Sequence, residues 1–259
     1  MIWPLTKPEF GSYEWLMREV GDLMQVGAKD STWTHEEHGR IDSLVQRGVR
    51  QFYSPPPLPG ERYGYDWSFL RPVLALDTVA EQAVYDLPVD WAMFRGPLVF
   101  LPDQNTSRAE VDITSLHRLM GLQTTKATGP PRYAATRAKE LDPAVGTRYE
   151  LVLYPEPDDE YHLQAPARLN PGDLSEGQFP YGGSVHYETV RASCISVATQ
   201  GDANAMQLFL QRLATSVGHD RKVNSPDTLG RDYDHSDVVE YPGLIRTGFQ
   251  VVAYKGVTS

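Results

Sequence analysis

Apolar residues recur at helical spacing in two pairs of segments that flank a stretch of different character. The first pair covers residues 12–26 and 34–53, and the second covers residues 184–200 and 202–220. A stripe that repeats every three to four residues is typical of an amphipathic helix that buries one face. Only Gly201 separates the second pair, which favours an antiparallel helical hairpin.

Polar residues, glycine and proline mark the ends of these predicted helices. Ser12 is expected to cap the first helix, and Gly27 is expected to end it. Thr34 and Glu37 have the spacing of a capping box, in which each residue satisfies a backbone N–H near the other. The prolines at positions 55–57 stop the second helix, because they lack the N–H donor and disfavour helical geometry before them.

Between the helix pairs the pattern changes to short runs of Val, Leu and aromatic residues separated by turn residues, which predicts strands. The runs are 73–76, 83–85, 98–100, 110–113, 132–135, 149–154 and 161–165. They predict a small sandwich or a barrel-like sheet. Residues 117–122 read either as one helical turn or as a loop.

The order of these elements predicts an α+β fold. Neither helix pair buries its stripe alone, so we expect the two pairs to pack as a four-helix bundle formed by residues 1–66 and 180–220. A β-rich insertion domain then covers residues 67–179. Residues 221–259 lose the periodicity and form an extended C-terminal arm, in which 239–241 and 248–254 favour strands that pair on a partner.

Composition is that of a globular protein, with 41% hydrophobic and 22% charged residues, which argues against wholesale disorder. The formal net charge of -10 disfavours binding to phosphates, since nucleic-acid affinity comes mainly from Lys and Arg. Cys194 is the only cysteine, which excludes an intrachain disulfide and favours a small buried residue. The sequence shows neither a signal peptide nor a run long enough to span a bilayer, so we expect synthesis in the cytoplasm.

Candidate catalytic and metal-binding patterns are weak. His35 and His38 flank two glutamates, but the spacing is one residue short of a metalloprotease helix, and Thr34 and Glu37 already cap this turn. The acidic run 232–237 lacks the glycine and the final glutamate of a calcium loop and reads as a solvated hinge. The sequence therefore predicts no enzyme, no metal site and no cofactor.

Residues 181–184, Tyr-Gly-Gly-Ser, form a glycine-rich entry to a helix. Such an entry either holds an anion or gives a flexible start with Ser184 as the cap. We favour the second interpretation.

Aromatic residues crowd around the proline-rich segment that follows the second helix. Stacking on nucleobases needs interleaved basic residues, and these are few here. We expect the aromatic residues to hold the segment against the helices or against a neighbouring subunit. They are Phe52, Tyr53, Tyr63, Tyr65, Trp67 and Phe69.

Short motifs in a fixed order carry a family resemblance. They are Gln51–Pro56, Tyr65–Pro72, Tyr85–Asp90, Pro131–Ala134, Leu153–Asp158 followed by Tyr161, and Leu229–Ser236. From about residue 34 to residue 236 the chain resembles head–tail connector or adaptor proteins of tailed bacteriophages, of the tail tubular protein A-like or head completion type.

The resemblance implies a structural virion protein of the neck or tail, without catalytic residues. It implies a homo-oligomeric, twelve-fold arrangement that binds the portal protein above and a tail, nozzle or tail-terminator protein below. Double-stranded DNA passes through the lumen without specific binding, and an acidic lumen would repel it. The expected partner-binding residues are those of the arm and the proline-rich segment, namely Tyr233, His235, Tyr241, Phe249, Tyr254, Phe52, Tyr53 and Trp67.

A carbohydrate-binding or cell-wall-degrading phage tail component is the alternative. Trp67, Trp91 and several tyrosines of the β-rich insert could present rings that stack on sugars. Aromatic residues scattered over strands are more often core or interface residues, so we prefer the adaptor interpretation.

Overall fold

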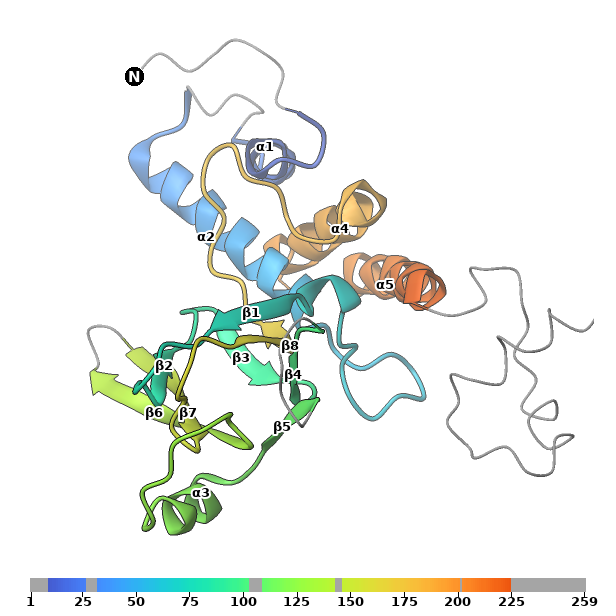
Figure 1. Ribbon diagram of the computed structural model, residues 1–259. Helices are drawn as coiled ribbons and strands as arrows, with labels where there is room; N and C mark the ends of the chain where they lie inside the picture. The colour runs from blue at the N-terminus through green and yellow to red at the C-terminus, as the bar shows by residue number, and fades with distance from the viewer. Residues whose placement is uncertain (1–8, 27–31, 103–108, 143–145, 201, 225–259) are drawn as a thin grey trace, which may run out of the picture.

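The computed structural model describes residues 9–26, 32–102, 109–142, 146–200 and 202–224 (Figure 1). Within these ranges the chain is an α+β protein with five α-helices, two short 3-10 helices and eight strands. The α+β class predicted from the sequence is therefore confirmed. Residues 221–224 of the predicted C-terminal arm are helical and belong to the last helix, so the predicted start of the arm is four residues too early. Residues 225–259 lie outside the described residues.

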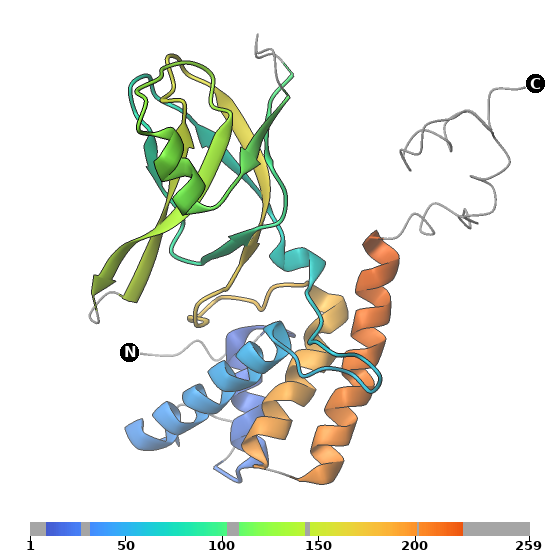
Figure 2. The same ribbon diagram turned by 90° about the horizontal axis from the view of Figure 1, so that it is seen from below.

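Four of the five α-helices gather in one part of the molecule, and the strands form the other together with the short helix α3 (Figure 2). The helices are α1 (Tyr13–Leu23), α2 (His35–Tyr53), η2 (Ser68–Leu70), α3 (Leu116–Leu122), η3 (Ser184–His186), α4 (Tyr187–Ala198) and α5 (Ala203–Asn224). The strands are β1 (Val73–Asp77), β2 (Val84–Asp86), β3 (Trp91–Phe94), β4 (Leu98–Phe100), β5 (Glu110–Ile113), β6 (Tyr133–Asp142), β7 (Gly146–Tyr154) and β8 (His162–Leu169).

Four of the α-helices share one apolar core, which we call the helical core. The helix α4 is central, because it packs against α1, α2 and α5, and α1 also packs against α2. Side chains from all four helices meet there, including Val20, Phe52, Val190 and Phe209. The helices are therefore held by burial of the stripes that their sequences predict.

The helices α2 and α4 approach closely at Gly48. An added Cβ at Gly48 would lie 2.5 Å from the Cα of Cys194 and 2.7 Å from its Sγ. Cys194 is buried at this crossing, as the sequence predicts. Burial raises the pKa of the Cys194 thiol to about 12, so the thiol stays protonated and serves as a small apolar side chain.

The strands form one mixed sheet in the order β1-β8-β4-β5-β6-β7-β2, and β3 also pairs with β8. All pairs are antiparallel except β5 with β6. The two ends of this order, β1 and β2, follow one another in the chain, and the sheet curls (Figure 2). The barrel-like alternative is therefore the closer of the two predicted arrangements.

The two faces of the sheet are covered differently. The inside holds a second apolar core, which includes Tyr85, Leu98, Val111 and Leu151. On the outside, the short helix α3 inserts Leu119 against β6 and β7. The helical alternative for residues 117–122 is thus confirmed, and this helix covers part of the outer face of β6 and β7.

The ends of the helices follow the predicted capping residues with two exceptions. The oxygen of Ser12 accepts a hydrogen bond from the N–H of Trp15, and both bonds of the Thr34 capping box form. The first helix ends early, at Leu23, because Gln25 adopts a left-handed backbone with φ of 60°. Ser184 is not the cap of α4; it begins η3, and His186 is the residue before α4.

Candidate functional site

Two segments connect the helical core to the sheet. Residues 54–72 lead from α2 to β1, and residues 170–183 lead from β8 toward η3. Both meet the sheet at the same end, because β1 and β8 are antiparallel neighbours. The first segment runs beside α5 on its way to the sheet (Figure 2). The residues of this joint therefore determine how the two parts are held together.

Asp66 lies at the joint and binds three arginines from different segments. The Nη2 of Arg71 lies 3.2 Å from Oδ2 of Asp66 and donates to the Asp66 carbonyl oxygen at 2.5 Å. Arg95, which follows β3, and Arg168, in β8, pair with the same carboxylate. We call these four residues the arginine cluster. Charge-assisted bonds to one carboxylate fix β3 and β8 relative to the segment that leaves the helical core.

Asp220 fastens the same segment to α5. Its Oδ2 accepts hydrogen bonds from the Tyr65 hydroxyl at 2.9 Å and from the Ser68 backbone N–H at 3.1 Å, and its Oδ1 accepts one from the Ser68 hydroxyl at 2.5 Å. The next residue of α5, Arg221, pairs with Glu61 at 2.5 Å. Burial, and then the bond to Asp220, raises the pKa of Tyr65 to about 12, so Tyr65 remains a donor at neutral pH.

The predicted partner-binding residues Phe52, Tyr53 and Trp67 are buried in the helical core. The Trp67 ring lies 4.7 Å from the Phe52 ring and 5.1 Å from the Phe69 ring, measured between centroids. Its Nε1 donates to the Phe52 carbonyl oxygen at 2.7 Å. The Tyr53 hydroxyl accepts from the backbone N–H of Tyr181 at 2.9 Å. These side chains hold both connecting segments against the helices, and their contribution to partner binding stays a prediction.

His186 packs beside the rings of Phe52, Trp67 and Phe69. It is 3% exposed, and its Nδ1 has no hydrogen-bond partner among the described residues. Burial, together with the charge of His219, lowers its pKa, whereas Asp220 acts in the opposite direction. Gly182, with φ of 107°, lets the backbone pass close by, since an added Cβ would lie 2.9 Å from the His186 ring. The glycine-rich entry at 181–184 is therefore shaped by packing.

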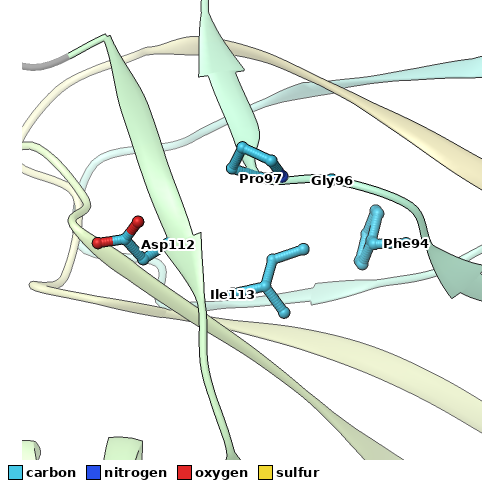
Figure 3. A pocket seen from close by; sticks show the side chains of 5 residues that line it. All are labelled: Phe94, Gly96, Pro97, Asp112 and Ile113. Atoms are coloured by element: carbon cyan, nitrogen blue, oxygen red, sulfur yellow. The ribbon is translucent and has the colours of Figure 1, made fainter. Parts of the chain in front are cut away.

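A shallow hollow of about 370 Å³ lies between the β3–β4 turn and β5. Its walls are Phe94, Gly96, Pro97, Asp112 and Ile113, and the Asp112 carboxylate lies at one side (Figure 3). It exists because β3 and β4 both lie along β8 but are interrupted at residues 95–97. Asp112 and Ile113 of β5 therefore pair with β6 on one side and with no strand on the other. The hollow offers one carboxylate and apolar walls.

The remaining predicted sites are placed as follows. In the part of the chain that the structure describes, no group of three or more His, Cys, Asp or Glu side chains could hold a metal ion. Residues 232–237 and the predicted partner-binding residues Tyr233, His235, Tyr241, Phe249 and Tyr254 lie outside the described residues.

The tryptophans of the carbohydrate alternative are not on the surface. Trp67 is fully buried in the helical core, and Trp91 is 8% exposed between Phe94 and Tyr149. Sugar binding by stacking needs an exposed ring face. The feature that motivated this alternative is therefore explained by packing.

Sequence reasoning missed the two acidic centres of the joint, Asp66 and Asp220. Asp66 stands inside the motif Tyr65–Pro72, where an acid sits between two aromatic residues and is followed by Arg71. Asp220 is the last residue of the apolar stripe, at a position that faces the core. An acid at a core-facing position is the signal that could have revealed a buried polar contact.

The structure thus defines a class of α+β protein with two cores, a rigid charged joint and no metal cluster among its described residues. The chain belongs to the SU10 adaptor protein family, whose profile matches residues 12–230; members are phage head–tail adaptors. No curated protein matches the chain. None of the described helices is both long and apolar enough to cross a bilayer.

Proposed function

We propose that this protein is the head-to-tail adaptor of a phage virion, which assembles as a twelve-copy ring between the portal and the tail or nozzle. The observation that carries the proposal is the family match over residues 12–230, which includes all described helices and strands. The family role is structural, and the joint described above is built from packing and ion pairs. We place the protein in the neck of the virion.

The two apolar cores support different roles for the two parts of the subunit. The four helices act as a bundle that forms the adaptor core, residues 1–66 and 180–220, and the curled sheet is the insertion domain, residues 67–179. Trp67, Leu70 and Leu174 pack into the helical core, so this core holds residues from both connecting segments. A fixed joint suits a subunit that must keep two neighbouring proteins at a set distance.

DNA passes through the lumen of this ring. The chain carries a formal net charge of -10, and a lumen of the same sign as the phosphates repels DNA and lowers non-specific adhesion. The result is a channel that guides DNA without holding it.

The C-terminal arm, residues 221–259, is the proposed contact with the portal or the tail protein, and its first four residues form the end of α5. Its residues Tyr233, His235, Tyr241, Phe249 and Tyr254 are the proposed contacts with that partner. At the root of the arm, Asp220 and Arg221 tie α5 to residues 61–68, so the arm leaves from a fixed point.

Electron microscopy of the protein mixed with portal-bearing heads tests the proposal. We expect a ring of density below the portal in the mixture and not in heads alone. Heads that carry no added density at saturating protein would contradict the adaptor role.

Deletion of residues 236–259 tests the arm separately. We expect the truncated protein to keep its thermal unfolding midpoint and to lose binding to portal-bearing heads. Binding equal to that of the full chain would remove the arm from the interface.

A further inference from the structure

The connection between β7 and β8 gathers four carboxylates within five residues, which we call the acidic loop (Glu156–Glu160). Asp158, Asp159 and Glu160 are exposed, and Glu156 is partly exposed. None of the four forms an ion pair with a described residue. Like charges at this spacing repel one another, so the loop keeps this arrangement only because other contacts hold its backbone.

Those contacts come from three neighbouring segments. The Glu156 N–H donates to the Ala127 carbonyl at 3.0 Å, and the Glu81 N–H donates to the Pro157 carbonyl at 2.8 Å. The Thr78 hydroxyl donates to the Asp159 carbonyl at 3.0 Å. The loop is therefore a rigid surface of negative charge, ready to bind cations without a further ordering step.

The arginine cluster carries the opposite surplus of charge, because its positive groups outnumber its negative ones. Within the described residues, Asp66 is the only carboxylate that pairs with Arg71, Arg95 and Arg168, so three positive charges meet one negative charge. The side chains of Arg71 and Arg95 are 42% and 40% exposed. Burial, and then the charge of Arg71, lowers the pKa of Arg168, which is the effect expected where cations outnumber anions.

The two charged surfaces lie at opposite ends of one strand. The acidic loop lies just before β8, and Arg168 is the second-last residue of β8. The end of β8 points toward the helices (Figure 2). Six steps of about 3.3 Å along the strand lead from His162 to Arg168, which corresponds to roughly 20 Å. The loop of one molecule therefore cannot reach the cluster of the same molecule, whereas it can reach that of another.

We propose that the acidic loop of one copy docks on the arginine cluster of the next copy, forming the heterologous contact that builds the ring. The inference rests on the proposed function and names the contact within it. A patch that binds a different patch on an identical neighbour yields a closed ring when the rotation per copy is right. Carboxylates and guanidinium groups form the strongest class of charged hydrogen bond, and their pairing would neutralise the surplus on both sides.

A disulfide trap between two single variants, Asp159→Cys and Arg95→Cys, tests the contact. The two proteins are mixed, bound to portal-bearing heads and mildly oxidised, and a gel without reductant then reports covalent dimers. We expect dimers in the mixture only, because each variant alone brings no second cysteine to the contact. The native Cys194 is buried, so the wild-type protein is the control for background oxidation.

Charge neutralisation gives a second readout. We expect the variant Asp158→Asn/Asp159→Asn/Glu160→Gln to lower self-association on heads about tenfold or more, as loss of close interfacial charge pairs does. A matched variant, Glu36→Gln/Glu110→Gln/Glu176→Gln, removes three exposed carboxylates elsewhere and should bind as wild type does. Raised salt should weaken the wild type and leave the neutralised variant unchanged.

The outcomes separate the two proposals. If wild-type protein does not bind heads, the adaptor role fails, and the same trap in free solution still reports whether loop and cluster meet. If both cysteine variants bind heads as wild type does but the mixture gives no covalent dimer, the docking proposal is overturned and the adaptor role stands. Loss of head binding with normal self-association would assign the loop to the portal or tail protein and would also overturn it.

Discussion

At the scale of single residues, Gly48 gives the sharpest test of the helical core. Alanine at this position would place its Cβ 2.5 Å from the backbone of Cys194 in α4, so the two helices must separate. We expect Gly48→Ala to lower the free energy of unfolding by about 1–3 kcal/mol, as overpacking does. Gly39 lies in the same helix with nothing within 4 Å of an added Cβ. Gly39→Ala should therefore raise stability by about 0.5–1 kcal/mol. Urea unfolding of both variants measures these changes in the free energy of unfolding. Equal effects would contradict the close approach of α2 and α4 at Gly48.

Asp66 is the second residue whose substitution should lower the stability of the whole protein. Asp66→Asn leaves three arginines without their shared anion, so we expect a loss of about 1–3 kcal/mol in the free energy of unfolding. Asp173→Asn is the control, because the pair of Asp173 with Arg50 is exposed on both sides and contributes at most about 1 kcal/mol. Chemical denaturation of the three proteins compares them. A loss at Asp66 no larger than at Asp173 would mean that the joint does not depend on this carboxylate.

His186 predicts a pH dependence of stability. Burial lowers its pKa in the folded chain below 6.5, the value expected when it is exposed, so the unfolded chain takes up the proton more readily. The contribution of neutral His186 is complete above pH 6.5 and is lost as the pH falls from there through the lower folded value. His186→Phe keeps a ring among Phe52, Trp67 and Phe69 but does not titrate. Thermal unfolding at pH 7.5 and 5.5 should show a smaller drop for this variant; equal drops would exclude His186 as a cause.

At the scale of elements, the capping box stabilises the first turn of α2. The Thr34 hydroxyl accepts from the Glu37 N–H at 3.3 Å, and the Glu37 carboxylate accepts from the Thr34 N–H at 2.7 Å. The bond from the Thr34 N–H, and then one that the Thr34 hydroxyl donates to the same carboxylate at 2.9 Å, lower the pKa of Glu37. We expect Thr34→Ala to lower the free energy of unfolding by about 1 kcal/mol. Circular dichroism during urea titration measures it, and Ser43→Ala, an exposed change within the same helix, should have little effect.

The helices could be predicted because their signals are local. An apolar stripe and a cap specify α1, α2 and α5 within a few residues, as the contacts of Ser12, Thr34 and Asp202 show. Periodicity does not specify partners, and the central place of α4 depends on a close approach at Gly48 that no single stretch of sequence reveals.

The strands were harder to predict where they depend on pairing. The strand β3 was missed because Trp91–Phe94 is short, follows Pro88 and contains a register shift opposite β8. The strand β6 continues to Asp142 through a polar stretch, which pairs with β7 although its composition does not favour a strand. The arginine cluster could not be predicted, since its members lie far apart in the chain and meet only when β3 and β8 pair.

At the scale of the whole molecule, the double connection makes the two cores one mechanical unit. Residues 54–72 are bound to α5 through Asp220 and to the sheet through Asp66, and residues 170–183 return beside them. An adaptor that transmits the position of a portal to a tail needs such a fixed relation between its parts. The charged surfaces at the two ends of β8 then give each copy one acidic and one basic face for its neighbours.

The central claim is that copies of this chain form a ring on the portal and connect it to the tail. Cryo-electron microscopy of portal-bearing heads saturated with the purified full chain tests it most directly. The adaptor role predicts a closed ring of twelve subunits below the portal, with the acidic loop of each beside the arginine cluster of the next. Heads without such a ring, or with isolated subunits that do not touch one another, would contradict it.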